Sequence, residues 1–500
     1  MTPLKILMVV PECRGMVQIG GLAEVANALS FALQQAGHDV RIAMPYYRFL
    51  ELDGKLPQPP ELLWQGELTL GALPPAAIYQ TSLPGKESAL PLYLVKGHAW
   101  FDEATTREKI YSPYNEPYIH FPAAVLRFLD QHAAWIPDVI HCHDYHTGML
   151  PVYLNTVFGG LVAGKPVRTV FTIHNLAFQG VGASSLLAYG GLPQDLASYA
   201  PGIKSLEYHG SINILKGAVG FSDITTTVSE TYAAEIQTPA QGKGLHGVLY
   251  EAALRGKLTG IVNGIDNAAW DPAALENELA FSVNHLKGKL AARQELRRWM
   301  GLAESTDPLL SVRSRWSYQK GLELLLYAIR YYHIYHKAQI AVVAWGPPTP
   351  EQDPYYYGLW CELIGWAASF PDRISFKYKD WPSTELHYAG SDMFLMPSLF
   401  EPCGLGQMEA MRYGAIPVVC KTGGLADTIK PGWGFSYEWP FTEPLDHDQK
   451  MDGTHRMVTA LEQAFKAFST PQWSEMVTLA MNRDNGWPTR VPFYEKVYQK

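Results

Sequence analysis

The sequence has few cysteines, no C-x-x-C pair and no apolar run long enough to cross a membrane. Its five cysteines are scattered over 500 residues, which favours free thiols in a reducing compartment. The first apolar run, residues 4–10, is too short for a membrane span and lacks the flanks of a signal peptide. We therefore expect a cytoplasmic protein, or a plastid stromal one whose targeting segment is not in this chain.

The chain also lacks a strongly basic segment. Its net charge of −8 and its scattered lysines and arginines argue against nucleic acid or an anionic membrane as a partner. An apolar content of 47% is typical of a globular protein. Because 500 residues exceed what one ordinary core accommodates, two large domains are expected.

Three common catalytic fingerprints are missing. There is no Walker A sequence and no G-x-S-x-G, and the glycine pairs in "VQIGGLAEV" and "TGGLADT" do not match G-x-G-x-x-G. A nicotinamide oxidoreductase, the generic alternative for two Rossmann-like domains, is therefore poorly supported.

Apolar strands and amphipathic helices alternate along the chain. "LKILMVV" is a continuous apolar run, helical spacing follows the first glycine pair up to Gly37, and "HDVRIAM" alternates as a second strand. This order predicts a parallel sheet. Residues 51–118 are rich in Pro, Gly and Tyr and are interpreted as a loop and hairpin region.

The alternation resumes and predicts two separate sets of strands. "DVIHCHD", "RTVFTIHN" and "DITTTVS" continue the first set, with "SINILKGAVGF" as a helix, and a second set begins near "KLTGIVNGID". We therefore predict an α/β protein with two doubly wound Rossmann-like domains facing a central cleft. The domains are expected at 1–256 and 257–482, and a C-terminal helix at 483–500 is expected to cross back to the first domain.

Two charged clusters follow predicted strands of the second domain. In "SRWSYQKG", Arg315 ends a strand and Lys320 precedes a helix, an arrangement that suits a diphosphate. In "PSLFEPCGLGQMEAMRYG", Glu401 and Glu409 lie eight residues apart and suit a ligand with hydroxyl groups at both ends. Surface cations, a helix-terminal charge and a solvated glutamate are the alternatives.

Two histidine-containing clusters follow strands of the first domain. In "HCHDYH", His141 and His143 share one strand face and His146 is nearby, so a metal site is an alternative to a structural role. In "TIHNLAFQG", His174 and Asn175 end a strand and either bind a ligand or cap the following turn.

Together these segments resemble the glycogen and starch synthases, glycosyltransferase family 5, whose fold is the two-Rossmann-domain GT-B type. The resemblance rests on "GGLAEV", "HCHDYHTGMLPVYL", "TIHNLAFQG", "GIVNGIDNAAWDP", "SRWSYQKG", "PSLFEPCGLGQMEAMRYG" and "PVVCKTGGLADTI". It implies transfer of glucose, usually from ADP-glucose, to the non-reducing end of an α-1,4-glucan with retention of configuration. It implies no metal or other cofactor, and a nucleotide sugar and a glycogen-like or starch-like polymer as partners.

The resemblance also implies a set of site residues. Arg315 and Lys320 would bind the donor diphosphate and neutralise the leaving nucleotide. Glu401 would bind the glucose, while Asp144 and His174 would line the sugar site from the first domain, with His174 near the 6-hydroxyl. The other donor-binding residues implied are Gln18, Gly20, Gly21, Asn175, Cys403, Gly404, Leu405, Glu409, Thr422, Gly423 and Gly424.

Several positions depart from the family pattern, among them His120 in "EPYIHF", the segment "WGPPTPEQ" and two of the implied donor-binding residues. Gln18 stands where the family's K-x-G-G-L motif has lysine, and Glu409 stands where most members have tyrosine. These departures keep two alternatives open: a catalytically weak glucan-binding or regulatory homologue, and a GT-B transferase with another donor or a small acceptor.

Overall fold

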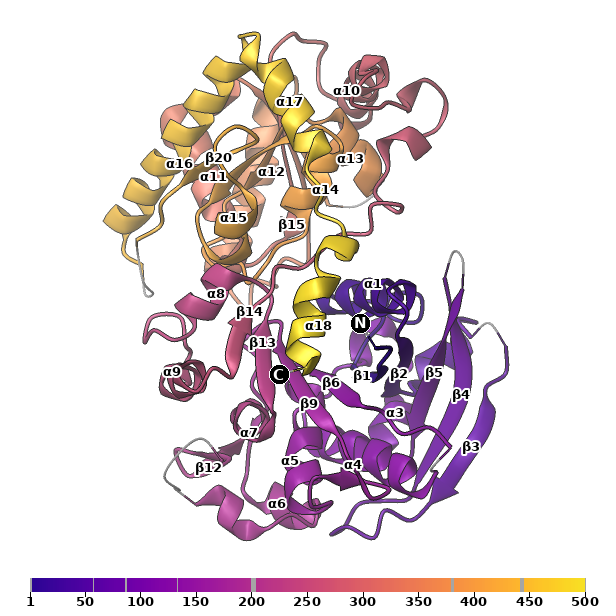
Figure 1. The fold of residues 1–500 in the computed structure, drawn as a ribbon. Helices are drawn as coiled ribbons and strands as arrows, with labels where there is room; N and C mark the ends of the chain where they lie inside the picture. The colour runs from indigo at the N-terminus through magenta and orange to yellow at the C-terminus, as the bar shows by residue number, and fades with distance from the viewer. Residues whose placement is uncertain are drawn as a thin grey trace. The chain divides into compact units, whose positions relative to one another are not determined.

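The chain divides into two compact units, which we describe separately (Figure 1). The structure is a computed structural model and describes residues 2–56, 58–85, 88–132, 134–198, 204–378, 382–440 and 445–499. Unit 1 contains Met1–Gly264 and Trp487–Lys500, and unit 2 contains Ile265–Gly486. Among the described residues, no helix is long and apolar enough to cross a membrane.

Unit 1 is built on a nine-stranded sheet with the strand order β14-β13-β9-β6-β1-β2-β5-β4-β3. Neighbouring strands from β14 to β5 are parallel, and the β5-β4-β3 end is antiparallel. The strands are β1 (Lys5–Val9), β2 (Asp39–Pro45), β3 (Glu61–Gly66), β4 (Ala76–Pro84), β5 (Ala89–Lys96), β6 (Val139–His143), β9 (Arg168–Ile173), β13 (Ile224–Thr227) and β14 (Leu258–Gly260).

The helices of unit 1 connect these strands. Short strand pairs lie outside the main sheet: β7 (Leu161–Val162) with β8 (Lys165–Pro166), and β10 (Val181–Gly182) and β11 (Glu207–Tyr208) with β12 (Ser211–Asn213). The helices are α1 (Gly21–Gln35), α2 (Arg48–Leu52), α3 (Ala99–Glu103), α4 (Glu116–Gln131), α5 (Met149–Thr156), α6 (Ser185–Tyr189), α7 (Ile214–Phe221), α8 (Glu230–Glu235), α9 (His246–Leu254) and α18 (Val491–Gln499).

Unit 2 has a six-stranded, fully parallel sheet with the order β17-β16-β15-β18-β19-β20. The strands are β15 (Leu309–Arg315), β16 (Gln339–Trp345), β17 (Ile374–Lys377), β18 (Met393–Met396), β19 (Ile416–Cys420) and β20 (Phe435–Tyr437). The helices are α10 (Lys287–Met300), α11 (Leu322–Tyr332), α12 (Pro354–Ser369), α13 (Thr384–Gly390), α14 (Gly406–Arg412), α15 (Gly423–Thr428), α16 (His447–Phe468) and α17 (Gln472–Asn482).

Both sheets are doubly wound, as predicted. In unit 2 the chain starts at β15, moves outward to β17 and returns to β18 on the other side of β15. In unit 1 the direction reverses in the same way between β1 and β6. Ligands of such sheets bind beyond the carboxyl ends of the strands at this reversal. The expected sites therefore lie after β1 and β6 in unit 1 and after β15 and β18 in unit 2.

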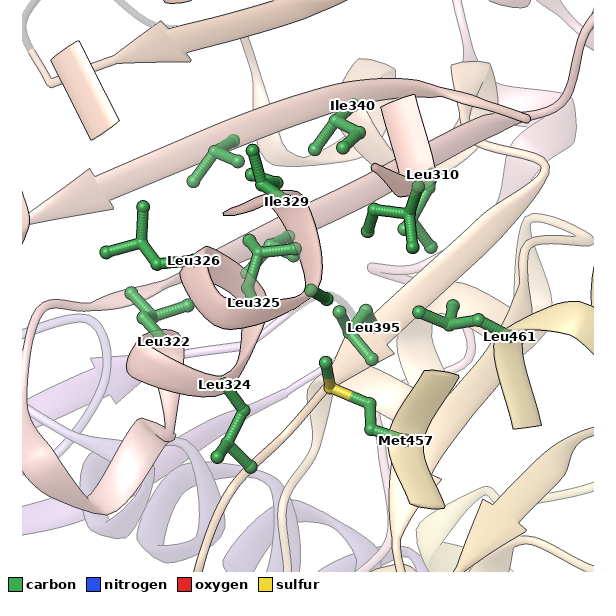
Figure 2. Close-up of a cluster of buried hydrophobic side chains, with 14 of the residues drawn as sticks. Leu310, Leu322, Leu324, Leu325, Leu326, Ile329, Ile340, Leu395, Met457 and Leu461 are labelled. Carbon is green, nitrogen blue, oxygen red and sulfur yellow. The ribbon is translucent and has the colours of Figure 1, made fainter. Parts of the chain in front are cut away.

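The core of unit 2 is a leucine-rich layer between α11, α16 and the sheet (Figure 2). Leu325, Leu326 and Ile329 of α11 are fully buried, as are Ile340 of β16 and Leu461 of α16. Burying a side chain of this size contributes about 1.5–3 kcal/mol. The layer makes the sheet a rigid support for the loops at its carboxyl edge.

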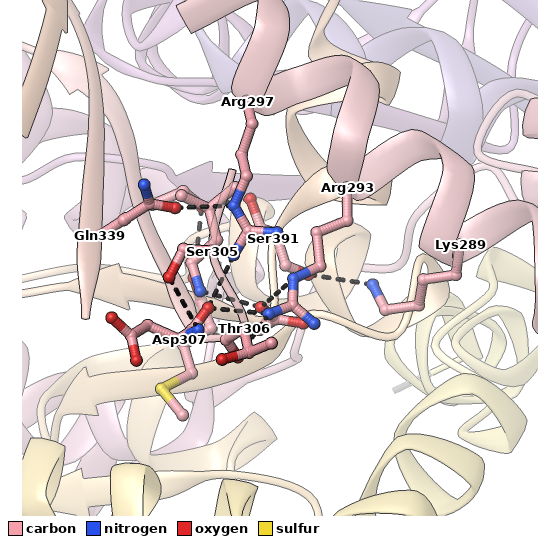
Figure 3. Close-up of polar contacts among 12 residues, drawn as sticks. Lys289, Arg293, Arg297, Ser305, Thr306, Asp307, Gln339 and Ser391 are labelled. Carbon is pink, nitrogen blue, oxygen red and sulfur yellow. Dashed lines mark hydrogen bonds and ion pairs between the residues drawn. The ribbon is translucent and has the colours of Figure 1, made fainter. Parts of the chain in front are cut away.

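Buried cations on helix α10 bind it to neighbouring segments of unit 2 (Figure 3). The ammonium group of Lys289 donates to the carbonyls of Ala389, Ser391 and Tyr413 at 3.2, 2.9 and 2.8 Å. Burial lowers the pKa of Lys289 to about 8. One turn later, Arg293 forms an ion pair with Asp392 at 3.0 Å. Three carbonyl acceptors compensate the desolvation of the ammonium group.

The structure changes four details of the expected organisation. "KLTGIVNGID" does not open the second sheet, because Leu258–Gly260 pairs with β13 in unit 1. The division falls after Gly264 rather than 256, and residues 487–500, rather than 483–500, belong with unit 1. Residues 51–118 contain more than loops and hairpins, since Ala89–Lys96 runs parallel to β2. Ser211–Asn213, expected to be helical, forms a strand.

Candidate active site

Two cations lie beyond the carboxyl end of β15. Arg315 is the last residue of that strand and is exposed. Its guanidinium group has no partner within the seven described stretches of the chain. Lys320 lies just before α11, and Gly321 between them has φ +61. A side chain at Gly321 would meet the carbonyl oxygen of Pro397 at 2.0 Å, so the turn that presents Lys320 requires glycine.

Lys320 is paired with Glu401, the predicted glucose-binding carboxylate. The ammonium group lies 2.5 Å from Oε2 of Glu401, which also accepts a hydrogen bond from the Ser398 hydroxyl at 3.0 Å. The side chains of Lys320 and Glu401 are only 19% and 8% exposed. The structure therefore brings together two residues 81 positions apart in a desolvated pair. A ligand at this pair would compete with Glu401 for the ammonium group and with Lys320 for the carboxylate.

The second glycine pair packs against the loop that carries Glu401. A Cβ atom at Gly423 would lie 2.0 Å from the carbonyl oxygen of Glu401, and one at Gly424 would lie 2.3 Å from that of Cys403. The amide of Gly424 donates to the Glu401 carbonyl at 3.2 Å. Thr422 is buried and precedes the first turn of α15. These glycines are therefore needed to hold the loop, whatever ligand is bound.

Glu409, on α14, has a different hydrogen-bond partner from Glu401. It is 8% exposed, and its Oε2 accepts a hydrogen bond from the Tyr388 hydroxyl at 2.9 Å. Burial and the Glu409 carboxylate raise the pKa of Tyr388 well above its usual value, while Arg313 opposes them. The structure thus places Tyr388 with Glu409, and Lys320 with Glu401. Sequence reasoning missed Tyr388, which lies 21 residues away from Glu409 on another helix.

The loop between Glu401 and α14 contains the two remaining predicted residues. Gly404 has φ +69, and a Cβ atom there would lie 2.6 Å from Oε1 of Gln407. Leu405 is half-buried and directly precedes α14. A tight, glycine-dependent turn therefore connects the carboxylate to the helix.

Asp144 follows β6 in unit 1 in a strained backbone conformation. Its φ of 56° and ψ of 173° lie in a region that is almost restricted to glycine and costs about 1–3 kcal/mol. Its Oδ1 accepts hydrogen bonds from the amides of His174 and Asn175 at 2.7 and 3.4 Å. Burial raises the pKa of Asp144 to about 7, although these amides lower it. Strain and an unfavourable buried carboxylate together are typical of a functional position.

His174 and Asn175 directly follow β9, the strand next to β6. Nε2 of His174 lies 2.9 Å from Nδ1 of His143. The side chain of Asn175 accepts a hydrogen bond from the Ala177 amide at 3.0 Å and so shapes the turn. The structure therefore unites Asp144, His174 and Asn175, which the sequence places about 30 residues apart.

The first glycine pair is bound by a carboxylate that the sequence did not single out. Glu12 follows β1, and its Oε2 accepts the amide of Ile19 at 2.5 Å. The amide of Gly20 lies 3.3 Å from Oε1. Burial raises the pKa of Glu12 to about 6 against these hydrogen bonds. In the sequence, its position after the first buried strand was the one feature that could have indicated a role for Glu12.

The space around the first glycine pair is open, in contrast to the second pair. A Cβ atom at Gly21 would meet no protein atom within 4 Å, and one at Gly20 would meet only Oε1 of Glu12 at 3.7 Å. Gln18 is exposed, and its side chain has no partner in the part of the chain that the structure describes. This unit therefore leaves room at the pair for a close-fitting ligand.

The histidines of "HCHDYH" do not converge on a common point. His141 contacts the hydroxyl groups of Tyr498 and Thr172 at 2.9 and 2.6 Å, while His143 contacts His174. His146 packs against Tyr145 with ring centroids 3.9 Å apart. Among the residues that the structure describes, no group of three or more His, Cys, Asp or Glu side chains is placed to hold a metal ion.

Two family models match the chain in the order of its two units. The starch synthase catalytic domain matches residues 5–251, and the model described as glycosyl transferases group 1 matches residues 294–440. The first match lies within unit 1 and the second within unit 2.

Curated relatives and solved structures match over almost the whole chain. Glycogen synthase 2 of Geobacter sulfurreducens is 37% identical over 99% of this chain and 98% of its own. Glycogen synthase of Gloeobacter violaceus is 36% identical over the same shares. The catalytic domain of starch synthase IV from Arabidopsis thaliana, solved with ADP and acarbose, has a TM-score of 0.80 and 30% identity and covers 100% of this chain and 99% of its own. Sucrose-phosphate synthase of Thermosynechococcus elongatus, with a TM-score of 0.58, 16% identity and coverage of 99% of this chain and 98% of its own, shares the fold.

Proposed function

Because the chain belongs to the glycogen and starch synthase family of GT-B glycosyltransferases, we propose that it transfers glucose from ADP-glucose to the non-reducing end of an α-1,4-glucan. The observation that carries this proposal is the Lys320–Glu401 pair beside Arg315 at the carboxyl edge of the unit 2 sheet. This set offers cations to a diphosphate and a carboxylate to sugar hydroxyls. The ADP in the starch synthase IV structure supports the choice of nucleotide.

The cations would contribute most while the donor breaks down. As the bond between the anomeric carbon and the phosphate oxygen lengthens, negative charge grows on the diphosphate. Arg315 and Lys320 would stabilise that charge more strongly than they stabilise the intact donor. The acceptor's 4-hydroxyl oxygen would bond to the anomeric carbon from the same face and give its proton to the departing phosphate. This route retains configuration and needs no covalent nucleophile.

The residues that follow β6 and β9 in unit 1 would bind the glucose. The carboxylate of Asp144 and the half-buried imidazole of His174 are groups that hold sugar hydroxyls in fixed directions. Positioning of this kind lowers the entropy cost of reaching a reactive geometry.

Incubation of the purified protein with glycogen and ADP-glucose tests the proposal. We expect ADP release and an equal molar gain of glucan-bound glucose, with slower transfer from UDP-glucose. Digestion of the new linkages by an α-specific but not a β-specific glucosidase would show retention. The Lys320→Ala variant is the matched control, because it removes a proposed donor contact. Transfer from neither nucleotide sugar would contradict the proposal.

A second candidate is a catalytically weak, glucan-binding homologue that regulates another synthase. The exposed Gln18 beside the open first glycine pair favours it, since a neutral side chain stands where the family has a cation. Glycogen binding without measurable transfer from any nucleotide sugar would select this alternative.

A further inference from the structure

Three histidines, His141, His143 and His174, lie in a row between Tyr498 of α18 and the carboxyl ends of β6 and β9. Nδ1 of His141 contacts the Tyr498 hydroxyl at 2.9 Å, and its Nε2 contacts the Thr172 hydroxyl at 2.6 Å. The ring of His143 lies 4.2 Å from that of His141, and its Nδ1 lies 2.9 Å from Nε2 of His174. The function proposed above uses His174 and leaves His143 without a role.

His143 and His174 are both neutral imidazoles at physiological pH. Burial lowers the pKa of His174 to about 3 and places that of His143 well below its usual value. A neutral imidazole has one N–H donor and one acceptor nitrogen. The bond between the two rings therefore has one donor and one acceptor, and the choice fixes the tautomer of both.

The surroundings of His143 decide which ring donates. Its second nitrogen, Nε2, is buried and has no hydrogen-bond partner among the described residues. If His174 donated, the proton of His143 would sit on this buried Nε2 without an acceptor. If His143 donates from Nδ1, its buried Nε2 carries only a lone pair. Orphaned buried N–H groups are rarer than orphaned acceptors, because they cost the full desolvation penalty.

The same bond sets what His174 offers to a ligand. With Nε2 as the acceptor, the proton of His174 must lie on Nδ1, which has no partner in the described part of the chain. The backbone of His174 is held separately by Asp144 at 2.7 Å. Asp144 thus fixes where the residue sits, and His143 fixes the ring's rotation and its tautomer.

We propose that His143 is a positioning residue that holds His174 in the Nδ1–H tautomer, so that His174 presents a fixed donor to a sugar hydroxyl oxygen. The inference rests on the proposed function for the identity of that ligand. The tautomer itself is a property of the free protein. It can therefore be measured even if the proposed function fails.

The first arm of the test is spectroscopic. The full-length protein is labelled with [15N]histidine, and long-range 1H–15N correlations are recorded at pH 7.5 without ligand. The His174 signals are assigned by their absence from a His174→Gln variant. We expect a protonated, pyrrole-like Nδ1 and a pyridine-like Nε2. The opposite pattern, or fast exchange between the two, would overturn the inference.

The second arm compares two replacements at position 143. His143→Asn keeps an N–H donor near the place of Nδ1, whereas His143→Leu has similar bulk and no donor. We expect kcat of the Leu variant to be at least about tenfold below that of the Asn variant, the factor for one lost hydrogen bond in the transition state. KM for ADP-glucose should change less. In the Leu variant the His174 signals should lose their single tautomer.

His146→Gln is the matched control, because His146 is also buried, lies three residues after His143, and contacts Tyr145 and Tyr118 rather than His174. It should leave the His174 tautomer unchanged. Equal kcat for the Asn and Leu variants, with His174 in one tautomer in both, would show that His143 only fills space. If the wild type transferred glucose from no donor but His174 had the expected tautomer, the proposed function would fail and the inference would stand.

Discussion

Replacing Asp144 by asparagine is expected to stabilise the protein and to reduce its activity. The carboxylate is 7% exposed, and burial raises its pKa to about 7 from the model-peptide value of 3.8. Asparagine keeps an oxygen that can accept the amide of His174. It also tolerates a positive φ better than most residues. The substitution therefore removes the buried charge and leaves the geometry of the turn in place.

The sign of the effect follows from proton linkage. Between pH 3.8 and 7 the folded protein holds a proton on Asp144 that the unfolded chain has released. The contribution of this group to stability therefore falls as pH rises through that range and is lowest above pH 7. From pH 5 to pH 8 this contribution to the stability of the wild type falls by about two pKa units, or roughly 2–3 kcal/mol. The Asn variant has no such loss.

Denaturant unfolding at pH 5 and pH 8 measures the difference. The stability advantage of Asp144→Asn over the wild type should widen by about 2–3 kcal/mol between the two pH values, while kcat falls at least about tenfold. Asp138→Asn, at the other end of β6, is the control. Burial raises the pKa of Asp138, but hydrogen bonds from Lys165 and the Lys5 amide lower it overall. The difference in stability between Asp138→Asn and the wild type should be the same at both pH values. Both lie above 3.8, so Asp138 is ionised in the folded and in the unfolded chain.

A constant difference for Asp144→Asn would mean that the carboxylate is not disfavoured in the folded state. If the wild type instead became more stable relative to the variant as pH rises, the charged form of Asp144 would be the one that the folded protein stabilises. Either result would remove the argument that Asp144 is kept for function at a cost in stability.

Four further outcomes are expected. Arg315→Ala and Lys320→Ala should each lower kcat about tenfold to a hundredfold; Arg315→Ala should hardly change the melting temperature, whereas Lys320→Ala should also lower it, because it leaves the Glu401 carboxylate buried without its cation. Early melting with normal turnover per folded molecule would make these residues structural. Gln18→Lys should raise kcat/KM for ADP-glucose, by a factor that corresponds to no more than about 1–3 kcal/mol of transition-state stabilisation. An unchanged kcat/KM would mean that this position does not approach the donor. Transfer should persist in EDTA, so an absolute need for a divalent ion would contradict metal-free catalysis. Gly21→Ala should fold normally and lose activity, whereas Gly424→Ala should be strongly destabilised; denaturation curves and specific activity separate the two.

The sheet strands were predictable where local sequence alone determines them. Continuous apolar runs such as Ile6–Val10 indicate strands buried on both faces, and the structure places them at the centre of the sheet. Leu258–Gly260 was assigned to the wrong unit because only three residues form the strand, and its partner β13 lies about 30 positions earlier. Strand pairing over that distance depends on the tertiary fold, which no local pattern records.

The sequence indicated which residues lie at the strand ends but not which groups they contact. Polar side chains at the ends of apolar strands pointed to His174 and Arg315, because parallel strands end at one edge, whereas Asp144 was implied by the family resemblance. Glu12 follows a strand in the same way, yet its carboxylate faces the amides of its own loop. Charge and spacing do not distinguish a ligand-binding carboxylate from one that shapes a loop, since both are short hydrogen-bond acceptors.

The two glycine pairs have the same sequence but differ in the physical reason for glycine. At Gly423 and Gly424 the protein's own backbone occupies the space of a side chain, so folding alone requires glycine there. At Gly20 and Gly21 that space is open within unit 1, and the nearest acid, Glu12, already accepts the amide of Gly20. An anion arriving at this loop would meet a carboxylate whose pKa burial raises to about 6. A diphosphate would therefore bind here only if a cation or a proton offset Glu12, and Gln18 supplies no charge. Under the proposed function, neutralising the diphosphate would therefore depend on Arg315 and Lys320, which makes their removal the most direct probe of donor binding.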